Sequence, residues 1–248
     1  SVSLFSSTAN ADLSKFFKKL GCESSTNAYS ITGSTPLVDS LLSVRYALYS
    51  EYIPNTDLVN YIQESGGTYL YENLYTLPLG FVLPYDLADN WQYQMENPAE
   101  VQNDLCLLLG TDDVLVPVET EVSGSGCTFT ADMAGEYYVY IQNKKVKNVK
   151  ASLPSGEKNF SNVDRGYLLE MGNLSEGSRI TLTPGESGET LTAAVYRFSP
   201  RAMIQVYDRL SQSPLHLDDW RDTKLTGTVT AAESGTLFLS IPYDEGWT

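Results

Sequence analysis

The stretch GEYYVYIQ, Gly135–Gln142, is the most strand-like segment of the chain, and it decides the fold that we predict for the second half. Aromatic and β-branched residues of this kind favour a pleated, partly buried strand. Comparable runs recur on both sides of it, and Gly, Pro, Asn and Ser separate them at the roughly 8–12-residue spacing of sandwich strands. These runs are VLVPVETEVS, GCTFTAD, VKNVKASL, GYLLEMGNL, SRITLTP and LTAAVYRF. The pattern predicts an antiparallel β-sandwich of jelly-roll type.

The part before residue 111 mixes helix and strand. ANADLSKFFKKLG has apolar residues at helical spacing and ends in Gly21, and NPAEVQNDLCLLLG has Pro98 at a helix start and Gly110 as its stop. A further helix is expected after a Ser34 or Thr35 cap. Strands are expected near residues 44–50, 68–72 and 79–84. The overall class is therefore α+β.

Two domains are predicted from this change of character. Residues 1–110 form a mixed α+β subdomain, and residues 111–248 form the sandwich with one inserted helix near 200–211. After that helix, TKLTGTVTAAESGTLFLSIPYDEGW reads as two strands joined by AAESG. The alternating pattern of GTLFLSIPYDEGWT, Gly235–Thr248, predicts a strand that continues further. We therefore expect a truncated C-terminal hairpin at the boundary of a longer protein.

The amino-acid composition indicates which class of protein to expect. Hydrophobic residues make up 42% and charged residues 19%, as in a globular chain with a core. No window approaches the ~20 apolar residues of a membrane helix, and the first residues lack the features of a signal peptide. We expect a soluble piece.

The net charge and the cysteine spacing limit the partners and ligands that we expect. The net charge of −15 argues against nucleic acid and opposes direct binding to an anionic membrane surface. The basic segment KKVKNVK is expected to be a solvated edge. Cys22, Cys106 and Cys127 form no metal-binding pair, so neither a metal nor a cofactor is expected; one disulfide would be compatible with three cysteines, but its pairing stays open.

Residues typical of catalysis are sparse. His216 lies beside Asp218 and Asp219, but neighbouring residues of an extended segment point to opposite sides, which favours structural or capping roles. None of the nucleophile-elbow, phosphate-loop, dinucleotide-binding or zinc-protease motifs occurs. We therefore assign no catalytic residue.

Aromatic residues in polar, loop-like sequence are the better lead. Trp91 and Tyr93 lie in DNWQYQM, and Trp220 follows Asp218 and Asp219. Aromatic rings flanked by acids and amides suit sugars, whose C–H faces stack while their hydroxyls find polar partners. These five residues are the candidate glycan-binding residues. In the alternative interpretation each tryptophan, Trp247 included, fills a domain seam or an end of the sandwich.

Four segments, taken in order, resemble the bacterial YfhO-type membrane proteins. They are SLFSSTANADLSKFFKKLG, DSLLSVRYALYS, YLYENLYTLPLGFVL and GTLFLSIPYDEGWT. The second signature of that family is a helix running into a strand near a basic residue and Tyr, here Arg45-Tyr46. The third is Tyr71-Glu72-Asn73 followed by Leu77-Pro78. Leu79-Gly80 follows where the family usually has Arg.

The resemblance implies a polytopic membrane protein similar to the GT-C glycosyltransferases, which move sugars from a lipid carrier to cell-surface polymers such as teichoic acids. This chain would be an extracytoplasmic region, partnered by membrane helices of the same protein and by a cell-wall glycan or teichoic-acid acceptor. It would position the acceptor and perform no chemistry itself. The alternatives are a stand-alone carbohydrate-binding or adhesion module of the cell surface, and a scaffold that binds nothing.

Overall fold

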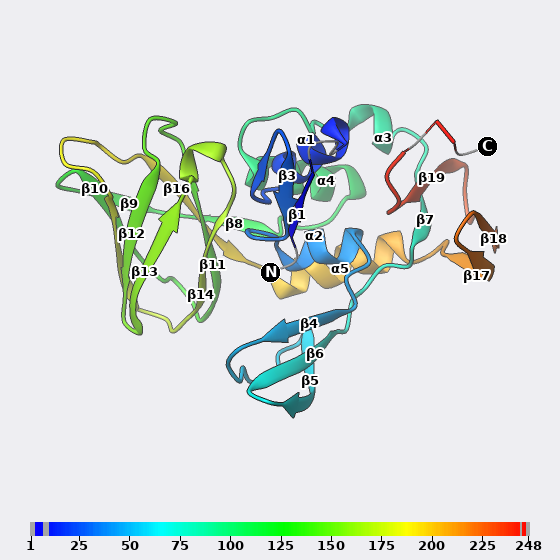
Figure 1. The fold of residues 1–248 in the computed structure, drawn as a ribbon, viewed down its shortest axis with the longest axis horizontal. Coiled ribbons are helices and arrows are strands. Elements are labelled where there is room, and N and C mark those ends of the chain that lie inside the picture. The colour runs from blue at the N-terminus through cyan, green and yellow to red at the C-terminus, as the bar shows by residue number, and fades with distance from the viewer. Residues whose placement is uncertain (1–2, 7–9, 244, 247–248) are drawn as a thin grey trace. The chain divides into compact units, whose positions relative to one another are not determined.

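A computed structural model describes residues 3–6, 10–243 and 245–246 of the chain. Trp247 lies outside these residues. The chain forms two compact units, each assembled from segments that are separate in the sequence (Figure 1). The first unit comprises Ser1–Ser34, Gln92–Asp104 and Asp113–Ser199. The second comprises Thr35–Trp91, Leu105–Asp112 and Pro200–Thr248. The predicted domains, 1–110 and 111–248, stay a prediction.

Two antiparallel sheets form a sandwich-like core in the first unit. Their strand orders are β13-β12-β15-β10-β9 and β14-β11-β16-β8. The strands of the first sheet are β9 (Thr120–Ser123), β10 (Gly126–Thr130), β12 (Asn148–Leu153), β13 (Gly156–Ser161) and β15 (Arg179–Pro184). Those of the second are β8 (Leu115–Val118), β11 (Gly135–Ile141), β14 (Leu169–Leu174) and β16 (Ala193–Phe198). The antiparallel sandwich is thus confirmed in outline, and the jelly-roll assignment stays a prediction.

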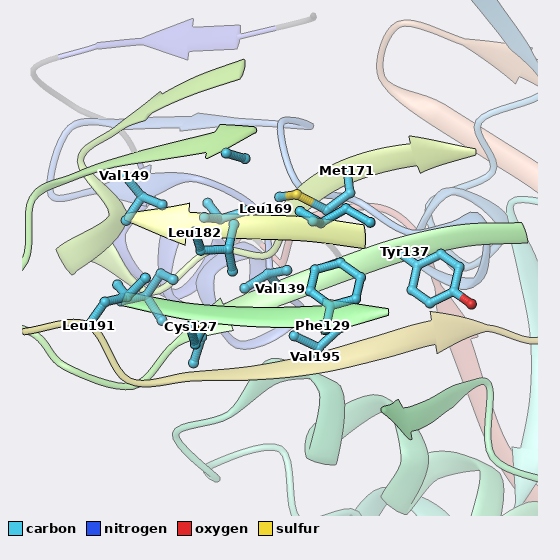
Figure 2. Packing of buried hydrophobic residues seen from close by; sticks show 14 of the residues in the cluster. Cys127, Phe129, Tyr137, Val139, Val149, Leu169, Met171, Leu182, Leu191 and Val195 are labelled. Carbon is cyan, nitrogen blue, oxygen red and sulfur yellow. The ribbon is translucent and has the colours of Figure 1, made fainter. Parts of the chain in front are cut away.

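Strand β11 is buried on both sides, which explains its run of apolar residues. Alternate side chains, those of Tyr137, Val139 and Ile141, belong to the buried core of the sandwich. The intervening Tyr138 and Tyr140 are also buried and belong to the other face of the strand. Figure 2 shows side chains of this core gathered between the strands, among them Phe129, Leu169, Leu182 and Val195.

The segment Gln92–Asp104 packs within the first unit through polar contacts to its backbone. The Tyr140 hydroxyl donates to Glu96 O over 3.0 Å, and Lys19 Nζ donates to Gln94 O over 2.6 Å. Lys19 lies at the end of helix α1 (Ala11–Lys19). The same unit holds a small sheet of order β1-β3-β2, with strands β1 (Ser3–Phe5), β2 (Ser24–Ser25) and β3 (Ala28–Ser30), and a 3₁₀ turn η1 (Val163–Arg165).

The second unit combines short helices with three small sheets. Its helices are α2 (Pro36–Leu41), α3 (Leu87–Asn90) and α5 (Pro200–Leu210), and the division between units falls inside α4 (Pro98–Leu109). Its sheets have the orders β4-β6-β5, β19-β7 and β17-β18. Their strands are β4 (Tyr46–Tyr49), β5 (Val59–Ser65), β6 (Thr68–Asn73), β7 (Gly80–Pro84), β17 (Leu215–Arg221), β18 (Lys224–Val229) and β19 (Gly235–Leu239). Helix α5 packs against α2 and β7.

The predicted helices are confirmed, but strand pairing corrects the sequence analysis at the C-terminal end. The strands on either side of AAESG do not pair with each other: β18 pairs with β17, and β19 pairs with β7. The prediction that the strands on either side of AAESG form a hairpin was therefore wrong. The reason is that PLHLDDW, which contains most of β17 and lies nearer to β18 in the sequence, was not recognised as a strand. Strands β5 and β13 were also missed. β13 is mostly exposed and polar and carries little strand signal, whereas the strand-forming Val59, Tyr61 and Ile62 of β5 were overlooked.

The run VLVPVETEVS is not one strand. It divides at Glu119 into β8 and β9, which belong to the two opposite sheets.

All three cysteines are buried and carry free thiols, and burial raises the pKa of Cys127.

One polar network joins the β10–β11 turn to strand β16. Asp132 accepts a 2.6 Å hydrogen bond from the Tyr137 hydroxyl and a 3.1 Å bond from Arg197 Nε. Burial by itself raises the pKa of Asp132, but these two partners outweigh it and hold the pKa below its ordinary value of 3.8. Burial also raises the pKa of Tyr137 to about 12, so its hydroxyl remains a donor at neutral pH.

We predict that Leu182→Ala lowers the free energy of unfolding by about 2–5 kcal/mol, since it leaves a cavity in the sandwich core. Val122→Ala is the matched control, because Val122 lies in the same sheet and is 89% exposed. Chemical denaturation followed by tryptophan fluorescence and circular dichroism measures both variants. Equal losses would contradict the assignment of Leu182 to the core.

We further predict that the stability advantage of the natural chain over Asp132→Asn depends on pH. A carboxyl whose pKa is depressed by folding stabilises the fold above its unfolded pKa, and this contribution disappears as the pH falls through the folded value. The difference in unfolding free energy should therefore shrink between about pH 6 and about pH 2. A difference that stays constant over this range would argue against the network. Denaturation curves at each pH provide the measurement.

Candidate functional site

Aromatic side chains gather on the three-stranded sheet β4-β6-β5 of the second unit. Figure 1 labels the three strands of this sheet. Directly opposed residues of antiparallel strands lie on the same face of a sheet, and faces alternate along each strand. Tyr61 of β5 and Ala47 of β4 both lie opposite Tyr71 of β6, so these three residues form one row across the sheet. In the next row on the same face, Glu64 of β5 and Tyr49 of β4 lie opposite Tyr69 of β6. Four tyrosines therefore share one face.

A fifth tyrosine, Tyr52, completes this group from the segment that follows β4. Its ring centroid lies 5.6 Å from that of Tyr61 and 6.0 Å from that of Tyr69, both in edge-on geometry. Tyr71 is edge-on to Tyr49 at 5.3 Å and to Tyr61 at 5.6 Å. Such arrangements are favoured between aromatic rings. We call these five residues, Tyr49, Tyr52, Tyr61, Tyr69 and Tyr71, the tyrosine face.

Tyr71 anchors the tyrosine face. It is fully buried, and its hydroxyl accepts a 2.8 Å hydrogen bond from Ile53 N and donates a 2.7 Å bond to Ile53 O. Asn55 Oδ1 accepts a further bond, of 2.7 Å, from Tyr61 N. Two side chains thus hold the 50–57 segment against the sheet. Tyr52 is thereby positioned beside Tyr61 while 57% of its surface remains exposed.

The opposite face of the sheet is also partly apolar. In one row of this face, Asn60 and Tyr46 lie on either side of Glu72. In the next row, Gln63 and Leu48 lie on either side of Leu70, and Leu48 is 70% exposed. Arg45 binds Glu72 over 2.9 Å, and its guanidinium carbon lies 5.3 Å from the Tyr46 ring centre.

Electrostatics keep the tyrosine face neutral and its margin acidic. Loss of hydration and the neighbouring Glu64 carboxylate raise the pKa of Tyr61, so its phenol stays protonated at neutral pH. Glu64 itself lies in the Tyr69 row, where one of its oxygens accepts from Gly67 N over 2.8 Å. Neutral phenol rings with polar hydroxyls offer stacking surfaces and hydrogen bonds together. This is binding chemistry rather than proton transfer or nucleophilic chemistry.

Metal-ligating side chains do not cluster in this site or elsewhere in the described part of the chain. Among residues 3–6, 10–243 and 245–246, no three His, Cys, Asp or Glu side chains come together as a metal would require. The sheet carries none of the charge concentration that a divalent ion demands.

The structure places Trp91 and Tyr93 in different units. Trp91 ends helix α3, where its backbone N donates to Leu87 O over 2.9 Å and its side chain is half-buried. Tyr93 is exposed on the 92–104 segment of the first unit. No shared surface is therefore defined for them.

Asp218, Asp219 and Trp220 all lie on strand β17. A register shift between Leu217 and Asp219 makes Asp218 the extra residue of a β-bulge. Asp219 binds Arg221 over 2.8 Å, whereas Trp220 lies opposite Leu225. Since faces alternate, the Trp220 ring and the Asp219 carboxylate belong to opposite faces of the hairpin. His216 is exposed on the same strand.

The chain has 17 tyrosines, but the sequence analysis did not predict the tyrosine face. A local signal was available, because Tyr69 and Tyr71 alternate as strand residues of one face do. The convergence of Tyr49, Tyr52 and Tyr61 on this pair depends on the register of β4 and β5, and β5 was not predicted as a strand.

Comparison with known proteins supplies the family. The model of the family described as bacterial membrane protein YfhO matches residues 1–114 and 118–248. The chain belongs to the YfhO family. This confirms the resemblance that the four ordered signatures indicated. No curated protein and no solved structure matches the chain.

The helices of this YfhO-family chain are short. Within the residues that the structure describes, none has both the length and the apolar character needed to cross a bilayer. The segment that carries the tyrosine face, residues 45–73, lies within the first matched range, and the Arg45-Tyr46 and Tyr71-Glu72-Asn73 signatures lie at its two ends.

We predict that Tyr71→Phe destabilises the tyrosine face by about 1–3 kcal/mol, because Ile53 N and O lose their shared partner in a buried site. Amide hydrogen exchange should accelerate at Ile53 and its neighbours, and limited proteolysis should cut the 50–57 segment sooner. Tyr85→Phe is the control, since Tyr85 is exposed elsewhere in the same unit. Unchanged exchange at Ile53 would contradict the anchoring role.

Proposed function

We propose that this chain is the acceptor-recognition region of a polytopic YfhO-family membrane glycosyltransferase, and that it faces the extracytoplasmic side. It would hold a cell-surface glycan near a catalytic centre in the membrane portion of the protein and perform no transfer itself. The observation that supports this proposal is the tyrosine face, a set of aromatic rings in edge-on contact that exposes Tyr49 and Tyr52, on a chain of a membrane-protein family.

The chemistry of the tyrosine face suits sugar rings. Phenol rings stack on the C–H faces of a pyranose while their hydroxyls exchange hydrogen bonds with its hydroxyl groups. Tyrosine also loses little conformational freedom on binding, because its side chain has only two rotatable angles. Tyr49 and Tyr52 provide the exposed rings, and Tyr61 and Tyr69 support them from the sheet.

Charge favours the sugar over the phosphate units of a wall polymer. The chain carries −15, and Glu64 lies within the tyrosine face. A polyanionic teichoic acid would be repelled at long range, although salt at ~0.15 M screens charges beyond about 8 Å. We therefore expect neutral wall polysaccharide to bind more tightly than teichoic acid, with teichoic-acid binding strengthened by salt.

We predict that Tyr52→Ala weakens binding to neutral cell-wall polysaccharide by about tenfold, which corresponds to ~1.4 kcal/mol. Calorimetric titration measures this, with Tyr85→Ala as the control for an exposed tyrosine of the same unit outside the site. Trp91→Ala, Tyr93→Ala and Trp220→Ala test the residues that the sequence proposed. The variants Asp218→Asn and Asp219→Asn complete that set.

Each outcome identifies a different function. Loss of binding only in Trp220, Asp218 and Asp219 variants would move the glycan site to the β17–β18 hairpin. Absence of binding by every form would favour a scaffold role within the membrane protein. Sugar transfer from a lipid-linked donor by the chain alone would overturn the non-catalytic assignment.

A further inference from the structure

The β17–β18 hairpin has one apolar and one polar face. The register opposes Leu215 with Val229, Leu217 with Gly227, and Trp220 with Leu225. Since opposed residues share a face, these pairs form one apolar face. The pairs on the other face are polar: His216 with Thr228, Asp219 with Thr226, and Arg221 with Lys224.

Close packing across the middle of the hairpin supports this division into an apolar and a polar face. A Cβ atom at Gly227 would lie 3.1 Å from Leu215 Cδ1 and 2.4 Å from His216 O. Glycine at this position lets the Leu215 side chain approach the neighbouring backbone, and the apolar face remains narrow there. A larger residue would push the two strands apart.

The apolar face is largely uncovered. Trp220 is 70% exposed, and Leu217 and Val229 are also exposed. The face continues onto the β19–β7 pair: a Cβ atom at Gly80 would lie 2.9 Å from Leu215 Cδ2 and 2.7 Å from Leu239 Cδ2. Leu237 and Leu239, both exposed, extend it along β19. Contiguous exposed apolar surface of this kind marks an interaction site.

The tip of the hairpin, WRDTKL at Trp220–Leu225, has the composition of a bilayer interface. Trp220 and Leu225 form its last apolar pair, and Arg221 and Lys224 form the basic pair next to the turn. Tryptophan prefers the headgroup region, where its ring is half apolar and its N–H is hydrated. Arg and Lys lay their apolar stems along a membrane surface and direct their charges to phosphate.

We propose that the β17–β18 hairpin docks on the lipid bilayer. Trp220 and Leu225 enter the interface between headgroups and acyl chains, and Lys224 beside the turn contacts lipid phosphate, while Arg221 stays paired with Asp219. The chain belongs to a family of membrane proteins, so a bilayer is within reach of the intact molecule. This proximity raises the effective concentration of the surface, and a weak intrinsic affinity is sufficient.

The net charge of −15 is expected to oppose binding to an anionic membrane. The hairpin does not reverse this expectation, because Arg221 and Lys224 lie among Asp218, Asp219 and Asp222, and Asp219 pairs with Arg221 at 2.8 Å. At ~0.15 M salt, charges more than about 8 Å away are largely screened, so docking depends on apolar contact rather than on charge. Apolar burial of Trp220 and Leu225 does not depend on charge.

Lipid fits this surface better than a glycan. A sugar site needs polar side chains around the ring, but Asp219 belongs to the other face and is paired with Arg221 at 2.8 Å. The neighbours of Trp220 on its own face are Leu225 and Leu217, which offer no hydrogen bond to a hydroxyl. The docking proposal is independent of the tyrosine face.

The test is flotation of the chain with vesicles of phosphatidylcholine alone, and of phosphatidylcholine with phosphatidylglycerol as the minor lipid, at physiological salt. The natural chain should float with both and no more with the second, because the acids beside Arg221 and Lys224 offset their charge. The double variant Trp220→Ala/Leu225→Ala should lose about tenfold in partitioning to both, since it removes most of the inserted apolar area. Arg221→Gln/Lys224→Gln keeps the apolar pair and should still float with phosphatidylcholine vesicles.

The control is Tyr46→Ala, which removes an exposed aromatic residue of a different sheet, β4-β6-β5, and should float like the natural chain. Circular dichroism verifies that each variant is folded. A natural chain that does not float, or a Trp220→Ala/Leu225→Ala variant that floats as well as the natural chain, would overturn the proposal. Hairpin variants that lose polysaccharide binding while keeping vesicle binding would also overturn it and would assign the surface to glycan.

Discussion

The alternation of side chains across a β-strand is the constraint on which this structure depends. It directs Tyr137, Val139 and Ile141 of one strand into the sandwich core while Tyr138 and Tyr140 belong to the other face. It also brings four tyrosines to one side of the β4-β6-β5 sheet, and it separates Trp220 from Asp219 on β17. Both surfaces proposed for binding therefore depend on the alternation of side chains between the two faces of a strand.

Small sheets need additional support, because two or three strands bury little apolar surface. In the β4-β6-β5 sheet the support comes from Tyr71, whose buried hydroxyl pairs with both polar backbone groups of Ile53. In the hairpin it comes from Leu215, which packs over Gly227 and reaches toward Gly80 of β7. Tyr71 is fully buried and Leu215 is partly buried, whereas residues left exposed, such as Tyr52 and Trp220, are available for binding.

The two surfaces proposed for function use aromatic residues in different ways. On the tyrosine face the rings contact one another edge-on, and the exposed Tyr49 and Tyr52 can offer both ring and hydroxyl to a hydrated ligand such as a glycan. On the hairpin a single indole stands beside aliphatic side chains, next to a basic pair at the turn. The first environment favours polar, ring-shaped ligands, and the second favours a boundary between hydrocarbon and water. Both fit a chain of the YfhO family.

The sequence by itself determined four of the helices, the sandwich-like second half, the acidic character and the family, because these follow from local spacing, composition and ordered signatures. It located α1, α2, α4 and α5 from caps, apolar period and glycine stops, but not the short α3. Strand partners were different: pairing β18 with β17 rather than β19, and joining β5 to β6, required the tertiary structure. The physical reason is that a ladder joins residues through backbone groups common to every amino acid, so the residue pattern does not say which strands pair. The tyrosine face and the two-sided hairpin both depend on that register, and only the tertiary structure decided them.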